Sequence, residues 1–128
     1  MAKRVYISFD YDHDDDLKTL LLGQAKNPGS PFEIADWSIK EPVTSNWKET
    51  ARTRIRAVDV VAVICGNYTH TATGVAAEVS IAQQENIPYF LLAGRSSGGN
   101  KKPTTAKTGD TIYKWTWENL KKLVGGAR

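Results

Sequence analysis

Runs of apolar residues along the chain predict the strands of a sheet. The runs alternate with helix-like segments, apart from a short last one, and cover residues 5–9, 32–37, 58–65, 87–93 and 112–115. The run 58–65 is apolar at every position except Asp59. A strand that is apolar on both faces belongs in the middle of a parallel sheet covered by helices.

The segments between these runs carry the signals of helices. A leucine-rich segment at 17–25 follows an acidic stretch, which complements the positive end of a helix dipole. Asn46, with Glu49 three residues later, forms a capping-box pattern and predicts a helix to about residue 57. Further helices are predicted at 72–85 and 117–124.

Alternating strands and helices predict an α/β fold: a flavodoxin-like, doubly wound parallel sheet flanked by helices, in a single domain. In such sheets, ligands bind at the carboxyl ends of the strands, where the strand order reverses. The expected binding edge therefore consists of the loops at residues 10–16, 38–45, 66–73 and 94–110. The last loop is rich in Gly, Ser, Lys and Thr, and we expect it to be mobile.

Composition and charge argue against several classes of function. The 17 basic and 14 acidic residues give a net charge of +3, and the basic clusters lack the interleaved aromatic residues of a single-strand nucleic-acid binder. The chain has no membrane-length apolar segment and no signal peptide, so we expect a cytoplasmic protein without membrane contact. Cys65 is the single cysteine, and neither His13 nor His70 has a partner at metal-ligand spacing, so we expect no metal site.

Glu78 stands out among the charged residues because of its place on the predicted helix 72–85. At 100° per residue, Val79 and Ala82 lie within about 40° of Val75 and form an inward stripe. Glu78 lies about 60° from Val75, between apolar neighbours and near the helix start. A carboxylate there could form a structural ion pair or could bind the hydroxyls or protons of a ligand, and the helical pattern leaves both open.

Several motifs follow one another in an order that has a known counterpart. The segments are Val5–Asp12 (VYISFDYD), Ile34–Ile39 (IADWSI), Asp59–Thr69 (DVVAVICGNYT), Gly74–Ala82 (GVAAEVSIA) and Ile87–Pro88. Together they span residues 4–93 and resemble the strands, the Gly-x-x-Thr loop and the glutamate-bearing helix of TIR-like domains. The resemblance is nearest to the bacterial TIR-like proteins of Thoeris anti-phage systems, of the ThsB type.

This resemblance implies an enzyme that cleaves the nicotinamide–ribose bond of NAD and makes an ADP-ribose-derived signal in anti-phage defence. NAD would be the substrate, and no cofactor is implied. Glu78 matches the family glutamate, which contacts the ribose; a carboxylate there stabilises the positive charge of the transition state more than the ground state. The substrate-binding residues implied in addition are Phe9, Asp10, Asp36, Trp37, Ser38, Asn67, Tyr68 and Thr69. Trp37 could stack on a ring of the substrate or pack in the core.

The family also implies partners. We expect self-association, and a separate effector protein that responds to the signal, because the chain carries no fused receptor or effector domain. The segment 113–120 differs from the usual family ending, and we expect its tryptophans to pack the last helix onto the sheet.

Three other readings compete with NAD cleavage. A non-catalytic TIR-like module would act by self-assembly, and a nucleoside deoxyribosyltransferase-like enzyme would use a glutamate on a different sugar. A phospho-receiver domain would explain the acidic cluster at 10–16. It would, however, need an aspartate at the end of the third strand and a lysine after the fourth, where this chain has Cys65 and Gly94-Arg95.

Overall fold

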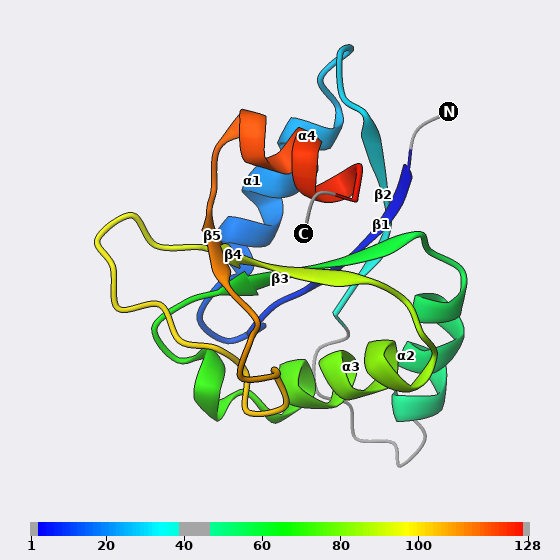
Figure 1. Ribbon diagram of the computed structural model, residues 1–128, viewed down its shortest axis with the longest axis vertical. Coiled ribbons are helices and arrows are strands. Elements are labelled where there is room, and N and C mark those ends of the chain that lie inside the picture. Colours follow the sequence, from blue (N-terminus) through cyan, green and yellow to red (C-terminus); the bar gives the residue numbers. More distant parts are fainter. Residues whose placement is uncertain (1–2, 39–46, 127–128) are drawn as a thin grey trace.

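A five-stranded parallel sheet forms the centre of the molecule in the computed structural model, which describes residues 3–38 and 47–126 (Figure 1). The strand order is β2-β1-β3-β4-β5. The strands are β1 (Lys3–Ser8), β2 (Phe32–Trp37), β3 (Val60–Cys65), β4 (Tyr89–Ala93) and β5 (Ile112–Lys114). This is the predicted flavodoxin-like arrangement, and its strand order reverses between β1 and β3.

Strand β3 occupies the middle of the sheet, as its apolar run predicts. All six of its residues are buried, and it pairs with β1 on one side and β4 on the other. Cys65, at its end, is a buried free thiol. Burial of the thiol raises its pKa to about 12, so it stays protonated and unreactive at neutral pH.

Helices cover both faces of the sheet. Helices α1 (Asp15–Ala25) and α4 (Trp117–Val124) lie on one face, and helices α2 (Trp47–Arg56) and α3 (Thr73–Gln84) lie on the other (Figure 1). The alternation of side chains along β1 supplies both layers, because Val5 and Ile7 pack toward α1 and α4 while Tyr6 packs toward α2 and α3.

The last segment packs as expected from its tryptophans. Trp115 and Trp117 contact the core on the side of α1 and α4, and the ring of Trp117 lies 6.4 Å from that of Phe32. The indole N–H of Trp115 also donates to the side chain of Gln24 on α1, at 2.9 Å. The tryptophans therefore fasten the end of the chain to both the sheet and α1.

Two strands begin or end at other residues than predicted, because backbone pairing does not follow the hydrophobic pattern there. Strand β1 begins at Lys3 and ends before Phe9, because the exposed Lys3 pairs with β2 through its backbone without an apolar side chain. Strand β3 begins two residues later than predicted, because the N–H of Val58 still bonds to Ile55 of α2. The predicted cap Asn46 and the predicted loop residues 39–45 lie outside the described residues.

The long segment 94–110 contains no helix or strand, as predicted, and several hydrogen bonds fasten it. Asn67 donates to the carbonyl of Gly98, Lys101 donates its N–H to Gly66, and Thr105 donates to the carbonyl of Ala76 on α3. Its mobility stays a prediction.

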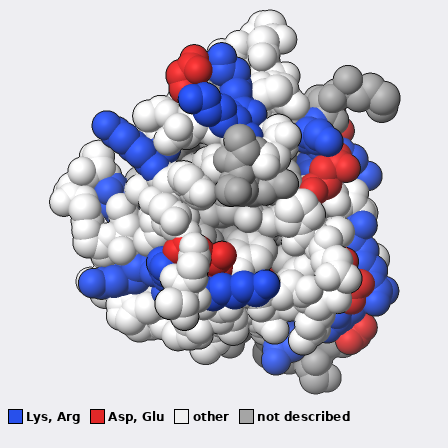
Figure 2. All heavy atoms as spheres, in the orientation of Figure 1, with Lys and Arg blue, Asp and Glu red and all other residues white. Residues whose placement is uncertain are grey.

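Charged side chains of both signs lie on the face of the molecule shown in Figure 2. Lys and Arg side chains are scattered over this face, and Asp or Glu side chains lie beside several of them. Across residues 3–38 and 47–126, no helix combines the length and the apolar character needed to cross a bilayer.

Candidate functional site

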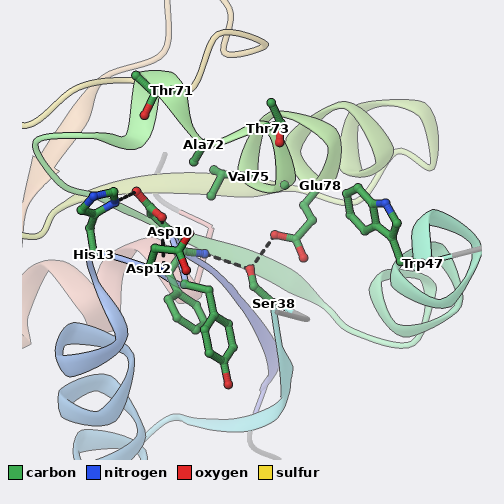
Figure 3. A pocket seen from close by; sticks show the side chains of 13 residues that line it. Asp10, Asp12, His13, Ser38, Trp47, Thr71, Ala72, Thr73, Val75 and Glu78 are labelled. Carbon is green, nitrogen blue, oxygen red and sulfur yellow. Dashed lines mark hydrogen bonds and ion pairs between the residues drawn. The ribbon is translucent and has the colours of Figure 1, made fainter. Parts of the chain in front are cut away.

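A cavity of about 380 Å³ opens at the carboxyl edge of the sheet (Figure 3). Its walls come from the ends of β1 and β2 and from the start of α3, which follows β3. The lining residues are Phe9, Asp10, Tyr11, Asp12, His13, Ser38, Trp47, Thr71, Ala72, Thr73, Gly74, Val75 and Glu78. The cavity therefore lies beside the reversal of strand order, where the fold class predicts a ligand.

Glu78 forms part of the cavity wall and is almost fully buried, with a relative exposure of 2%. Three hydroxyls from other elements donate to its carboxylate. Ser8 Oγ and Ser38 Oγ donate to Oε1 at 2.8 and 2.6 Å, and the hydroxyl of Tyr6 donates to Oε2. An ionised carboxylate is therefore held in a fixed orientation by β1 and the end of β2.

Strand alternation explains why two of these hydroxyls come from β1. Tyr6 and Ser8 are two residues apart, so both side chains point to the face of the sheet that carries α3. Both are fully buried polar residues on a strand whose other face is apolar. Buried hydroxyls need partners, and Glu78 supplies them.

Ser38 is fixed by the backbone around the end of β1. Its N–H donates to the carbonyl of Ile7 at 2.8 Å, and its Oγ accepts the N–H of Phe9 at 3.0 Å. The hydroxyl proton is then directed at Glu78. Ser38 thus connects the two strand ends to the carboxylate.

The environment of Glu78 changes its proton affinity. Burial raises its pKa from 4.5 to about 7, and the hydrogen bonds from Ser38, Tyr6 and Ser8 oppose that rise. Burial also raises the pKa of Tyr6 far above its ordinary value, and the neighbouring carboxylate adds to this effect. Tyr6 therefore remains a neutral hydrogen-bond donor while Glu78 titrates near neutral pH.

The first turn of α3 forms one wall of the cavity. The N-cap residue is Ala72, whose side chain makes no capping hydrogen bond. The first N–H groups of a helix have no partner within the helix, so this uncapped turn presents donors and a positive dipole end to the cavity. Such a helix start suits a phosphate group.

The opposite end of the cavity holds a histidine and an aspartate. His13 Nδ1 lies 2.7 Å from Asp10 Oδ2, and the imidazole stacks on the ring of Tyr68 with centroids 4.3 Å apart. The other oxygen of Asp10 accepts the N–H of Asp12 at 3.2 Å. Figure 3 shows Asp10 and His13 on one side of the cavity and Glu78 with Trp47 on the other.

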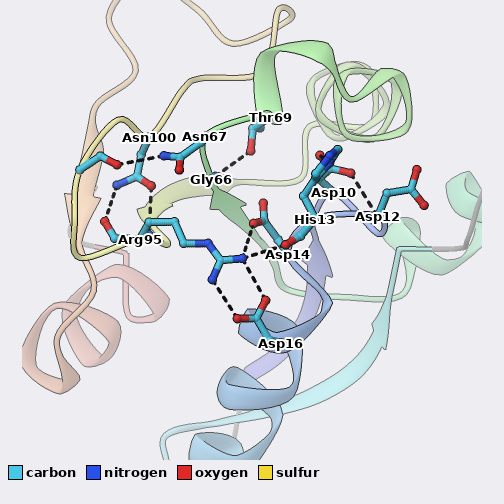
Figure 4. A network of polar contacts seen from close by, with 11 residues as sticks. Asp10, Asp12, His13, Asp14, Asp16, Gly66, Asn67, Thr69, Arg95 and Asn100 are labelled. Carbon is cyan, nitrogen blue, oxygen red and sulfur yellow. Dashed lines mark hydrogen bonds and ion pairs between the residues drawn. The ribbon is translucent and has the colours of Figure 1, made fainter.

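A charged network behind this end holds the loop after β1 in place (Figure 4). The guanidinium of Arg95 bonds to both oxygens of Asp16, to Oδ1 of Asp14 at 3.0 Å and to the carbonyl of His13 at 2.8 Å. Asp14 is buried, and none of the described residues forms a hydrogen bond with its Oδ2. That oxygen packs against Gly66, where a Cβ would find no room.

Burial raises the pKa of Asp14, and the bond from Arg95 opposes the rise. The hydrogen bonds that Asp16 itself accepts from Arg95 lower the pKa of Asp16. Arg95 therefore supplies the positive charge that keeps this acidic loop folded against the end of β3.

The structure brings four of the sequence-predicted site residues together around the cavity: Phe9, Asp10, Ser38 and Glu78. Asp36 and Trp37 lie elsewhere. Asp36 forms an ion pair with Arg54 at 3.2 Å, and Trp37 packs on the core face of α1 and α4, with the Lys18 ammonium 5.2 Å from its ring centroid.

The three predicted residues that follow β3 also lie outside the cavity lining. Thr69 is buried and accepts the N–H of Gly66 at 2.7 Å, and Asn67 donates to Gly98. Tyr68 is 52% exposed and reaches the site only by stacking on His13. A role of these residues in substrate binding stays a prediction.

Sequence reasoning missed Tyr6, Ser8 and His13. The signal for the first two is a tyrosine and a serine at alternate positions of an otherwise apolar buried strand, which marks a polar spot on one face of the sheet. Residues 71–73 lie in a loop that was expected at the binding edge, whereas Trp47, Gly74 and Val75 carry no comparable signal, because their place at the cavity depends on how α2 and α3 pack. Within the described part of the chain, no group of three or more His, Cys, Asp or Glu residues could hold a metal ion.

Comparisons with known proteins agree with this fold and also identify the family of the chain. Residues 6–95 match the model of the TIR-like domain of Thoeris protein ThsB. Among solved structures, a prokaryotic SEFIR domain has a similar fold, with a TM-score of 0.54 and 20% sequence identity over 94% of this chain and 86% of that chain. A search among curated proteins finds no significant match. The matched segment includes Tyr6, Ser8, Ser38 and Glu78, and the chain belongs to the TIR-like family of Thoeris protein ThsB.

Proposed function

We propose that this protein cleaves the bond between nicotinamide and ribose in NAD and converts the ADP-ribose part into a signal of bacterial anti-phage defence. The observation that carries the proposal is the buried carboxylate of Glu78, fixed by three hydroxyls in the wall of a cavity at the ligand-binding edge.

The hydrogen bonds of Glu78 leave it able to contact a ligand. A carboxylate has about four lone-pair positions. Oε1 accepts from Ser8 and Ser38, and Oε2 accepts from Tyr6. Among the described residues only Tyr6 donates to Oε2, which leaves a second lone-pair position on this oxygen for a ribose hydroxyl.

The chemistry requires little more than this charge. When the bond between ribose C1′ and the ring nitrogen breaks, its electron pair moves to the nitrogen, and the cationic pyridinium leaves as neutral nicotinamide. Positive charge develops on the ribose. The ionised Glu78 stabilises that charge strongly because its surroundings exclude water, and its hydroxyl partners are already oriented. A hydroxyl acceptor then bonds to C1′ and loses its proton.

The rest of the cavity suits the remainder of the substrate. The uncapped first turn of α3 can bind the pyrophosphate. Trp47 lines the same cavity as Glu78 and offers an aromatic surface for a ring (Figure 3). The product would act on a separate effector protein, and self-association would control the site.

The test measures nicotinamide released from NAD by the purified protein, at high protein concentration, by chromatography. Glu78→Gln keeps the size of the side chain and removes the charge, and we expect it to abolish release. The matched control is Glu118→Gln on α4, whose side chain is 72% exposed and distant from the cavity lining. Release that is unchanged in Glu78→Gln would refute the role of Glu78.

Two further measurements on the same protein, of nucleoside base exchange and of self-assembly, separate the competing functions. Exchange of bases between nucleosides, without turnover of NAD, would identify a deoxyribosyltransferase-like enzyme. Self-assembly without any turnover of NAD or nucleosides would identify an interaction module.

A further inference from the structure

The end of the cavity opposite Glu78 contains a second group able to move a proton. His13 and Asp10 both line the cavity, and Nδ1 of the imidazole lies 2.7 Å from Oδ2 of the carboxylate. Asp10 has a relative exposure of 8%, whereas the side chain of His13 is 46% exposed. The pair thus joins a buried carboxylate to an imidazole that solvent and ligands can reach.

The bond to Asp10 defines which nitrogen of His13 carries the proton. An ionised carboxylate only accepts hydrogen bonds, so Nδ1 of the imidazole is the donor. In the neutral imidazole, Nε2 is then the basic nitrogen with a free lone pair. Among the residues that the structure describes, none forms a hydrogen bond with Nε2.

Several contacts hold this pair rigid. Tyr68 covers one side of the imidazole, the carbonyl of His13 accepts from Arg95, and the N–H groups of His13 and Asp14 bond to the carbonyl of Asp10. An orienting carboxylate and a braced imidazole are the arrangement of a general base.

We propose that His13, positioned by Asp10, is the general base that takes the proton from the hydroxyl acceptor of the ADP-ribosyl group. This inference rests on the proposed cleavage of NAD. In this proposal Glu78 stabilises the ribosyl cation, and His13, at the opposite end of the cavity, activates the hydroxyl acceptor.

The step balances without a co-reactant. The oxygen of water, or of an alcohol bound at this end, forms a bond to C1′ as the bond from C1′ to nicotinamide breaks. The O–H proton passes to Nε2 of His13, and the leaving nicotinamide takes the electron pair of the broken bond. His13 then returns the proton to solvent through its exposed side.

The other ionisable groups of the cavity are less suited to this step. Glu78 is committed to the ribose and to its three hydroxyl donors, and Asp10 already accepts from His13 and from the N–H of Asp12. Imidazole is the side chain that enzymes use most often as a general base.

The test compares two acceptors with the full-length protein. Hydrolysis needs a base because water loses a proton, whereas exchange of nicotinamide for added 3-acetylpyridine needs none, because the attacking pyridine nitrogen carries no proton. We expect His13→Gln to slow hydrolysis by about 100-fold or more while base exchange stays within about twofold. The matched control, His70→Gln, replaces an exposed histidine outside the cavity lining and should change neither rate.

Asp10→Asn tests the positioning role, since it removes the carboxylate that orients the imidazole. We expect a loss of hydrolysis of about tenfold, smaller than that of His13→Gln and larger than any loss of base exchange, because both reactions use the same bound substrate. Glu78→Gln should abolish both reactions.

The outcomes distinguish this inference from the function on which it rests. Equal slowing of hydrolysis and base exchange in His13→Gln, or no slowing of either, would overturn the role of His13 and leave NAD cleavage standing. Absence of both reactions in the wild-type protein would overturn the proposed function and this inference with it.

Discussion

Replacing Glu78 by glutamine removes a buried charge while keeping the size of the side chain. The amide oxygen can still accept from a serine hydroxyl, and the hydroxyls can rotate to accept from the amide N–H₂. The variant therefore isolates the effect of ionisation in the interior. We expect its free energy of unfolding to depend on pH less steeply than that of the wild-type protein.

The magnitude follows from the pKa of Glu78, which burial raises from 4.5 to about 7. The native state binds this proton more tightly than the unfolded state, so the stabilisation is present below pH 4.5 and is lost as the pH rises through 7. Between pH 5 and pH 8 the wild-type protein should lose about 2–3 kcal/mol through this group, since one pKa unit corresponds to about 1.4 kcal/mol. Glutamine does not titrate, so the Glu78→Gln variant should not show this loss of stability between pH 5 and pH 8.

The assay is urea unfolding at a series of pH values, followed by the fluorescence of the four tryptophans. Other titrating groups, including Asp14 with its raised pKa, are present in both proteins and cancel in the difference. Glu118→Gln should retain the wild-type slope. Parallel curves for Glu78→Gln and the wild-type protein would refute the reasoning, because they would mean that Glu78 has the same pKa in the folded and unfolded states.

Further predictions concern the hydrogen bonds and packing around the site. Nicotinamide release should rise with pH as the buried Glu78 ionises near pH 7. Ser38→Ala removes a hydrogen bond that lowers the pKa of Glu78, so the midpoint of the pH profile should move up by about one unit. An unmoved midpoint would contradict the assignment of the profile to Glu78. Arg95→Ala leaves the buried Asp14 without its cation and should lower the free energy of unfolding by about 3 kcal/mol, and adding Asp14→Asn should restore part of the loss in urea unfolding. Gly66→Ala should cost about 1–3 kcal/mol because a Cβ collides with Asp14, whereas Gly23→Ala on α1, where the space is open, should stabilise by about 0.5–1 kcal/mol; thermal unfolding of the two variants tests the contrast.

The sequence predicted the layers of the molecule well. The apolar run ending at Cys65 placed a strand in the middle of a parallel sheet, and the spacing of Val75, Val79 and Ala82 placed Glu78 on the border of the buried face of its helix. Both results depend only on local periodicity. Alternation by two or by 3.6 residues determines which side chains share a face, whatever the rest of the chain does.

The partners of Glu78 could not be found in the same way. Tyr6, Ser8 and Ser38 lie 72, 70 and 40 residues away along the chain, and they meet the carboxylate only because β1, the end of β2 and α3 pack at one edge. The pairing of His13 with Asp10 is local, but its place in the same cavity as Glu78 depends on the loop that Arg95 holds.

The sequence by itself therefore determined the order of the elements, the faces they bury and the position of one carboxylate at the ligand-binding edge. Only the tertiary structure decided how strongly that carboxylate is desolvated, which hydroxyls orient it and which imidazole lines the same cavity. The physical reason is that desolvation and hydrogen bonding depend on the atoms within a few ångströms of the group. These atoms come from distant segments of the chain, and local periodicity does not specify how those segments align with one another.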